Sequence, residues 1–348
     1  MFFWASTTRR DVGISAYASY VLRIVTATFI WLHMNDLEHD VLGTLRRNRS
    51  GSESTKVNRR DLTMRFANRL GEQFRGLRLT NLKKDHIDWY LTYLTTMRSQ
   101  RTGMVLEPGT QKNNLAALRW LLQCVGKPNL LPKTNSKLGI KRRVYVTNIS
   151  KSITITDETI DGIGQHCPYA SISILLSREF GLRIEESFKI IPIEADAGSM
   201  LRLKGSWTKG NVPREIPILR DSQRSAIRRA RELAGDNSLI PAKLIYSEHL
   251  RASRDLYNKF GIHQNHGLRH QYAQHRFLEL AGFECPACGG LMRDEMTEAQ
   301  YRIDRSVRKT VSRELGHGRV SVTSVYLGSP TLKSTPKSNE LDRLLGEA

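Results

Sequence analysis

The chain has 348 residues, 39% hydrophobic and 25% charged, so it is long enough for two domains and too apolar for wholesale disorder. Lys and Arg number 54 against 34 Asp and Glu, which gives a formal net charge of +20. An excess of that size favours a polyanionic partner, nucleic acid before an anionic membrane. Four cysteines are too few for a disulfide scaffold in a chain this long, which favours a reducing cytoplasm.

The first 56 residues do not fit a recognisable domain. Ile14 to Met34 is largely apolar, but Arg23 in its middle makes a membrane span costly. Asn48 to Lys56 is polar and rich in Ser and Gly, which is typical of a linker. We therefore leave residues 1–56 as an unassigned extension and linker, expect no membrane anchor, and expect the remainder to work without them.

Residues 57–143 are predicted to form a small all-α domain. Apolar residues recur at helical spacing from about Val57 to Cys124, and Pro108–Gly109 interrupts the pattern, which predicts four or so helices. Basic residues are spread through this region, and Lys112 is one candidate for a phosphate contact.

A basic linker joins this region to the next. It runs from Lys127 to Lys151 and includes Arg142 and Arg143. This run is either a strap along a phosphate backbone or a solvated linker, and the sequence does not decide between them.

A second, mainly α domain with a small sheet is predicted over residues 152–348. The predicted elements are a helix from Thr156 or Asp157 to about His166, a helix from Pro168 to Gly181, a β-hairpin over Met200–Leu219, a helix capped by Asn265 that ends at Gly282, and a last helical run up to Gly316. Arg224 and Arg228 belong to an arginine stripe at helical spacing, which either faces phosphates or is solvated.

Four short segments of this second domain carry the residues suited to phosphodiester chemistry. In chain order they are Gly181-Leu-Arg183, Lys209 beside the hairpin turn, His266-Gly-Leu-Arg269-His270, and Leu315-Gly-His317 with Tyr326 nine residues beyond it. Each segment alone is weak, because an isolated Arg, His or Tyr is more often structural. Their order and spacing together are specific.

This set resembles the boxes of the tyrosine recombinase (phage integrase) family. The resemblance covers roughly Ile153 to Leu327, and the HGLRHQYAQ phrase and LGH…VYLG ending are most similar to integrases of mobile elements. It implies an α-helical core-binding domain and a catalytic domain that close around DNA as a C-shaped clamp. It implies site-specific recombination through a 3′-phosphotyrosyl link, a homotetramer on double-stranded DNA, and no cofactor.

The resemblance also implies a role for each matching residue. Tyr326 is the nucleophile, and a tyrosine needs a base or a positive environment because its ordinary pKa is about 10. Arg183 and Arg269 bind the non-bridging oxygens of the phosphate and stabilise its transition state. His266 and His317 donate to the phosphate, or one of them helps to deprotonate the tyrosine.

Lys209 is expected to protonate the leaving 5′ oxygen. Lys204 competes for this role, but the TKGNVPREIPI segment around Lys209 is the better match to the family's hairpin lysine. Glu186, three residues after Arg183, is expected to orient that arginine.

One insertion departs from the family pattern. Arg269 and His317 are 48 residues apart, about twice the gap of compact members, and the excess includes Phe283–Gly290 with Cys285 and Cys288. A zinc site would need a second ligand pair, so we predict a glycine-ended turn with two free thiols and no metal.

Two rival functions stay open at this stage. A strand swivelase of the type IB topoisomerase kind would use the same tyrosine and arginines. A DNA-binding regulator without catalysis would need the basic surface but not the catalytic residues. No expected catalytic residue is missing, which disfavours the regulator. The sequence leaves open the target site, the bias between integration and excision, and the need for accessory DNA-bending proteins.

Overall fold

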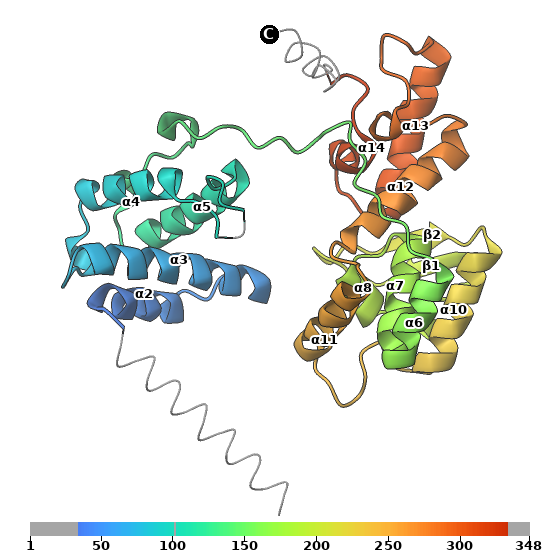
Figure 1. Cartoon of the computed structure of the whole chain (residues 1–348), viewed down its shortest axis with the longest axis horizontal. Coiled ribbons are helices and arrows are strands. Elements are labelled where there is room, and N and C mark those ends of the chain that lie inside the picture. Colours follow the sequence, from blue (N-terminus) through green and yellow to red (C-terminus); the bar gives the residue numbers. More distant parts are fainter. Residues whose placement is uncertain (1–33, 101, 333–348) are drawn as a thin grey trace, which may run out of the picture. The chain divides into compact units, whose positions relative to one another are not determined.

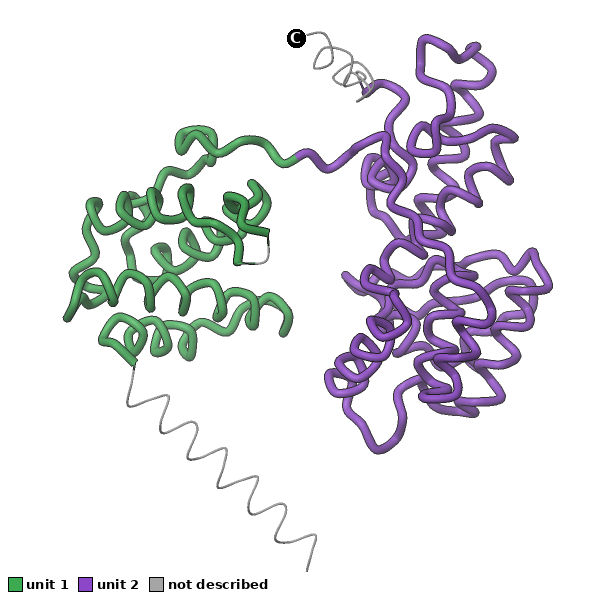
Figure 2. The backbone as a smooth tube through the Cα atoms, in the orientation of Figure 1, with its two compact units in different colours: residues 1–143 green, residues 144–348 purple. Residues whose placement is uncertain are grey.

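The computed structural model describes residues 34–100 and 102–332. The chain divides after Arg143 into two compact units (Figures 1 and 2). The apolar stretch from Ile14 lies almost wholly outside the described residues. No described helix is long and apolar enough to cross a membrane. The expected closure of both units around DNA stays a prediction.

The first unit is a bundle of α-helices. Its helices are α2 (Asp36–Arg47), α3 (Glu53–Gln73), α4 (Lys84–Thr96) and α5 (Pro108–Cys124), with short 3-10 turns at Leu79–Asn81, Pro128–Leu130 and Ser136–Leu138. Helix α3 packs against α2, α4 and α5. Phe66 and Leu70 of α3 contribute to one continuous apolar core, so the helical periodicity of the sequence is confirmed here.

The N-terminal boundary of this unit needs a correction. Helix α2 belongs to the core, because Leu37 and Val41 are fully buried in it. The predicted linker 48–56 is also shorter than expected, since α3 begins at Glu53 with Ser52 capping its first turn. Asn35 and Glu38 form a capping box at the start of α2. This capping box was missed in the sequence because Asn35 directly follows the apolar stretch and was grouped with it as an unassigned extension.

The second unit contains the predicted hairpin among many helices. Its elements are α6 (Asp157–His166), α7 (Pro168–Phe180), α8 (Ile184–Lys189), α9 (Pro192–Ala195), β1 (Met200–Leu203), β2 (Arg214–Pro217), α10 (Asp221–Ala234), α11 (Tyr246–Lys259), α12 (His266–Ala281), α13 (Glu298–Glu314) and α14 (Ser324–Leu327), with 3-10 turns at Gly205–Trp207, Pro286–Cys288 and Val320–Thr323. Strands β1 and β2 pair antiparallel, with Met200 opposite Pro217 and Leu203 opposite Arg214.

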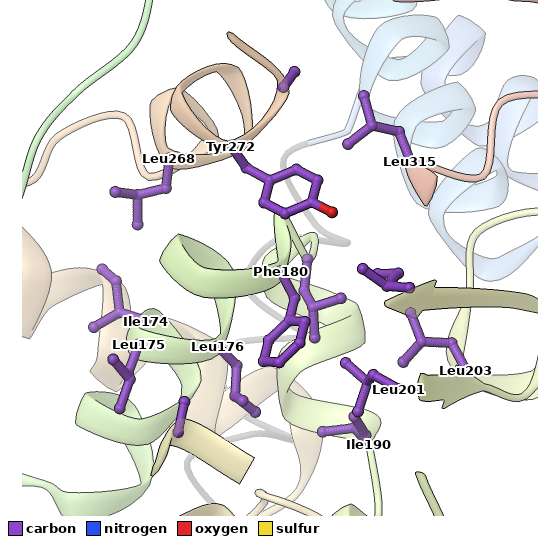
Figure 3. Packing of buried hydrophobic residues seen from close by; sticks show 14 of the residues in the cluster. Ile174, Leu175, Leu176, Phe180, Ile190, Leu201, Leu203, Leu268, Tyr272 and Leu315 are labelled. Carbon is purple, nitrogen blue, oxygen red and sulfur yellow. The ribbon is translucent and has the colours of Figure 1, made fainter. Parts of the chain in front are cut away.

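Helix α7 is the centre of this unit, and it packs against α6, α8, α10 and α12. Figure 3 shows its Ile174, Leu176 and Phe180 between Leu268 of α12 and Leu201 of β1. Helix α7 ends at Gly181, whose φ of +61° is a left-handed conformation that suits glycine. The turn that ends α7 lies against Tyr272 of α12.

Most predicted helix starts are confirmed, with one correction. Thr156 caps α6 by accepting a hydrogen bond from Thr159 N, and Pro168 occupies the first turn of α7. Asn265 does precede α12, but its side chain makes no capping hydrogen bond and its backbone is already helical. Asparagine is a common capping residue, but the helical backbone at Asn265 does not let its side chain cap α12.

Candidate active site

Arg183 is positioned by the turn that ends α7. Gly181 cannot carry a side chain there, because a Cβ would lie 2.6 Å from Cδ1 of Tyr272. Arg183 then begins α8, and Glu186 of the same turn accepts hydrogen bonds from Arg183 N at 2.8 Å and Arg183 Nη1 at 2.7 Å. Glu186 thus orients the arginine, as expected from its spacing.

Arg269 and His266 lie in the first turn of α12. Arg269 is 1% exposed, which is rare for an arginine, and every nitrogen of its guanidinium has a partner. Nη1 donates to the carbonyl of Gly181 at 2.5 Å, and Nη2 donates to the carbonyl of Leu315. Arg269 therefore joins the turn after α7 to the end of α13.

His317 and Tyr326 come from the segment after α13. Gly316 has a φ of +67° and ends that helix, and His317 N bonds back to Ser312 O at 2.9 Å. Tyr326 lies on the short helix α14 and is 5% exposed. Its ring stacks on His317, with centroids 5.3 Å apart. The structure thus brings the LGH segment and the tyrosine together.

A chain of hydrogen bonds connects Arg269, Tyr326 and His266. Arg269 Nε lies 3.3 Å from the hydroxyl oxygen of Tyr326, and that oxygen lies 3.2 Å from His266 Nε2. An arginine only donates, so the hydroxyl accepts from Arg269 and has its own proton free to donate to His266. This geometry makes His266 a candidate base for the tyrosine proton.

The histidines around Tyr326 are neutral at pH 7. Burial, followed by the charges of Arg269 and Arg183, lowers the pKa of His266 to about 4 and that of His317 to about 3. His317 Nε2 lies 3.4 Å from the donor Arg269 Nη2, and its Nδ1 lies 3.1 Å from Thr323 Oγ1. The proton of neutral His317 therefore resides on Nδ1, facing Thr323.

Arg269 stays positively charged despite its burial. Burial and then the neighbouring Arg183 lower its pKa to about 10, still well above neutral pH. Its longest hydrogen bonds are those to Tyr326 and His317, at 3.3 and 3.4 Å. A phosphate could displace these two contacts at lower cost than the carbonyl contacts on the other side of the guanidinium.

A second buried arginine supports the site and was missed in the sequence. Arg214, on β2, donates to both oxygens of Glu186 at 3.1 and 2.7 Å and through Nε to the carbonyl of Glu314 at 2.9 Å. The side chain of Glu314 accepts from Tyr272 and Arg276. The partners of Arg214 are 28 and 100 residues away in the chain, so no local pattern could reveal them.

The two hairpin lysines differ in their surroundings. Lys204 forms an ion pair with Glu194 at 2.5 Å and lies over the ring of Trp207. Lys209 is exposed beside the turn, where Gly210 and Asn211 both have positive φ. Within the described residues, Lys209 has no hydrogen bond or ion pair. We call Tyr326 and the side chains of Arg269, His266 and His317 around it the tyrosine cluster. The structure does not bring Lys209 into contact with this cluster.

The residues predicted to bind the DNA backbone are spread over both units. On α10, Arg224 is paired with Asp196 at 2.8 Å, whereas the exposed Arg228 lies 4.0 Å from Glu232. Lys112 is half-buried on α5, and Arg142 is exposed beyond it. The side chain of Arg143 packs over Gly109. Their contact with DNA stays a prediction.

Cys285 and Cys288 lie in the predicted glycine-ended turn. Cys288 N bonds to Cys285 O at 2.9 Å, and Gly289 follows with a φ of +85°. Burial raises the pKa of the Cys285 thiol to about 12. The described residues contain no group of three or more His, Cys, Asp or Glu arranged to hold a metal ion. The absence of zinc stays a prediction.

Two protein-family models match this chain. The family model described as "Phage integrase, N-terminal" matches residues 34–131, and the model described as "Integrase" matches residues 142–275. These matches define the class of the protein as a DNA strand-transfer enzyme. The chain belongs to the tyrosine recombinase (phage integrase) family, whose members are site-specific DNA recombinases. No curated protein sequence matches it significantly.

Solved structures share the fold at low sequence identity. A lambda integrase dimer bound to a COC′ core site has a TM-score of 0.52 and 14% identity, covering 95% of this chain and 91% of that one. The XerH recombinase on palindromic difH, in a post-cleavage complex, has a TM-score of 0.52 and 14% identity, covering 89% and 85%. A lambda integrase tetramer bound to a Holliday junction has a TM-score of 0.51 and 13% identity, covering 96% and 91%.

Proposed function

We propose that this enzyme cuts and rejoins double-stranded DNA at specific sites, with Tyr326 as the nucleophile. The observation that carries the proposal is the hydrogen-bond chain from Arg269 Nε through the Tyr326 hydroxyl to His266 Nε2. The base is neutral and can take a proton, and the arginine can stabilise the phenolate that forms.

The chemical step is a transfer of one phosphodiester bond. The Tyr326 oxygen bonds to the scissile phosphorus as the bond to the 5′ oxygen breaks, and His266 takes the phenolic proton. Lys209 gives a proton to the departing 5′ oxygen, which leaves as a hydroxyl. A 5′ hydroxyl of the partner strand then attacks the 3′-phosphotyrosyl link, which reverses the step without ATP.

Positive charge at the site supports this reaction. Arg183 and Arg269 bind the non-bridging oxygens, and the His317 ring packs on Tyr326 beside them. Oriented charges in a site that excludes water are usually the largest contribution to such catalysis. The arginines supply the charge, so the proposal includes no cofactor.

The net charge of +20 supports double-stranded DNA as the partner. Recombination must cut four strands, and one nucleophilic tyrosine per chain then requires four chains. The similar lambda integrase tetramer on a Holliday junction supports a homotetramer. We further propose a cytoplasmic enzyme that integrates and excises a mobile element, with Lys112, Arg142, Arg143, Arg224 and Arg228 among its phosphate contacts.

Trapping the covalent intermediate tests the proposal. Nicked DNA from the ends of the element lets the cut fragment diffuse away, so the phosphotyrosyl link accumulates. Mass spectrometry should find the nucleotide on the peptide that spans Val320 to Leu327. Tyr326→Phe removes only the phenolic oxygen, so it should still bind DNA and form no adduct. An adduct on another residue, or undiminished adduct in Tyr326→Phe, refutes the assignment.

A further inference from the structure

The segment that follows the tyrosine is held by parts of the chain distant in sequence. Ser329 N donates to Asn148 Oδ1 at 2.8 Å, and Asn148 Nδ2 donates back to Ser329 O at 3.1 Å. Arg293 N donates to the carbonyl of Pro330 at 2.9 Å. We call residues 328–330 the post-tyrosine segment. Its backbone is therefore hydrogen-bonded both to Asn148, which precedes α6, and to Arg293, which precedes α13.

A buried arginine holds the same segment from α13. Arg308 Nη1 donates to the carbonyl of Gly328 at 2.8 Å. The guanidinium is fixed by Asp304, whose oxygens accept from Nε at 2.8 and 3.0 Å, and it lies over the ring of Phe277. An arginine that is 6% exposed and paired in this way has little freedom to move.

The insertion between α12 and α13 closes the remaining side. A Cβ on Gly328 would lie 2.7 Å from Ala287 N and 2.6 Å from Asn148 Oδ1, so the chain packs there with no space to spare. The turn itself is tight, since a Cβ on Gly290 would overlap the carbonyl of Glu284. The insertion that departs from the family pattern thus packs directly against the post-tyrosine segment.

Tyr326 itself is tied to the same surroundings. Its carbonyl accepts from Gln274 Nε2 at 3.0 Å, and Gln274 Oε1 accepts from Ser150 at 3.0 Å. Only Leu327 separates the tyrosine from Gly328. A two-residue tether spans at most about 7 Å, so a fixed Gly328 confines the Tyr326 backbone to that radius.

We propose that Asn148, Pro286, Ala287, Arg293 and Arg308 form a clasp that positions the nucleophile. The clasp keeps Tyr326 beside Arg269 and His266 of its own chain and prevents it from reaching the active site of a neighbouring copy. Pro286 and Ala287 are supplied by the insertion that also contains Cys285 and Cys288. These are positioning residues, since none of them contacts the tyrosine hydroxyl. The inference rests on the proposed function of Tyr326.

Asn148→Ala is the variant that tests the clasp, because it removes both hydrogen bonds to Ser329 and a weaker one to Met292 Sδ from a half-buried side chain and leaves the core intact. Adduct formation on nicked DNA should slow by about tenfold or more, since small misplacements of a reacting group cost that much. DNA affinity should stay within about twofold. Ser329→Ala is the matched control, because among the described residues the Ser329 hydroxyl bonds only to Thr331, and the Ser329 backbone remains available to Asn148.

Hydrogen exchange measures the same contact without catalysis. The Ser329 amide should exchange faster in Asn148→Ala. Asn148→Asp should restore its protection only in part, because the carboxylate keeps the acceptor for Ser329 N but loses the donor to the Ser329 carbonyl. Unchanged exchange in Asn148→Ala, or an adduct rate within twofold of wild type, overturns the clasp. If wild type forms no adduct, the proposed function fails, and the exchange result still decides whether the clasp holds the segment.

A mixing experiment tests confinement to one chain. Tyr326→Phe supplies a complete site without a nucleophile, and Arg183→Ala supplies a nucleophile without a complete site. With the clasp intact, the mixture should give no more adduct than Arg183→Ala alone. Adding Asn148→Ala to the Arg183→Ala chain should produce adduct on that chain. If the mixture forms as much adduct on the Arg183→Ala chain with Asn148 in place as it does with Asn148→Ala, the confinement is wrong.

Discussion

Arg214 Nη2 donates to Glu186 Oε2 over 2.7 Å at the base of the tyrosine cluster, and both side chains are buried. The same carboxylate orients Arg183 and lies 3.9 Å from Arg269 Nη1. Burial alone would raise the pKa of Glu186, but Arg214 first, and then Arg269 and Arg183, lower it to about 2. One carboxylate thus holds three arginines near the phosphate-binding position.

Glu186→Gln should therefore impair both stability and cleavage. The neutral amide leaves buried arginines without a counter-charge, so the free energy of unfolding should fall by about 3 kcal/mol. Urea denaturation measures this loss. Adduct formation should fall as Arg183 loses its orientation. Glu185→Gln is the control, because Glu185 is 43% exposed in its pair with Lys189 and should cost less than about 1 kcal/mol. Equal costs for both variants would contradict a buried network.

The histidine cluster predicts a loss of stability on mild acidification. In the folded protein the pKa values of His266, His270 and His317 are about 4, 4 and 3, below the ordinary value of about 6.5. Above pH 6.5 both states are neutral at these positions. As the pH falls from there toward 4, the unfolded chain takes up protons that the folded chain does not, so the free energy of unfolding decreases.

Urea denaturation of the DNA-free protein at pH 7 and pH 5 measures this effect. His270→Asn should reduce the difference between the two pH values, because one buried neutral histidine is removed. The exposed His275 is the matched control, and His275→Asn should leave the difference in place. A stability that rises on acidification would show that the cluster is protonated in the folded protein.

Lys209→Ala should slow cleavage while leaving DNA affinity almost unchanged, because its proposed role is confined to the transition state. DNA with a 5′-thio leaving group needs little protonation and should rescue the variant. Lys204 is already paired with Glu194, so Lys204→Ala should behave like wild type. If the thio substrate rescues Lys204→Ala instead, Lys204 is the acid.

The corrected N-terminal boundary predicts that α2 is needed for folding of the first unit. Leu37→Ala removes a fully buried side chain and should lower the unfolding free energy by about 2–4 kcal/mol. Val57→Ala is the control, since Val57 is 57% exposed and should cost less than about 0.5 kcal/mol. Removal of residues 1–55 should accordingly destabilise this unit, contrary to the expectation from sequence.

Binding to DNA should weaken steeply with salt. Six phosphate contacts predict a loss of roughly 10³ in affinity between about 50 and 200 mM salt. Arg142→Ala should reduce the slope of log affinity against log salt by about 0.9 if that side chain makes one contact. Filter binding over this range measures both, and a flat response would contradict the electrostatic argument.

The sequence allowed most of the site to be predicted because its residues lie in short segments with local signals. Gly181 and Gly316 mark helix ends and are followed closely by Arg183 and His317, whereas His266 and Arg269 share the first turn of α12 at a spacing of three. The hairpin was predictable from Leu201, Leu203, Ile216 and Ile218 and from its turn. These features depend on interactions between residues close together in the chain.

The supporting residues could not be predicted, because their partners are distant in sequence. Arg214 meets Glu186 and Glu314, and Asn148 meets Ser329 across 181 positions. Asn148 lies in what the composition shows only as a polar linker. Its proposed role depends on a fold that brings the linker next to Ser329, and no periodicity in the sequence indicates that proximity.

Arg269 makes the assembly of the candidate site depend on the folding of distant parts of the second unit. Its one side chain contacts the turn after α7, the end of α13 and the tyrosine, which are 88, 46 and 57 residues away along the chain. A copy that has folded only in part carries the same arginines, histidines and tyrosine, but as separate pieces. The proposed cleavage therefore requires all three parts of the chain to be folded at once, because only then does Arg269 lie beside Tyr326.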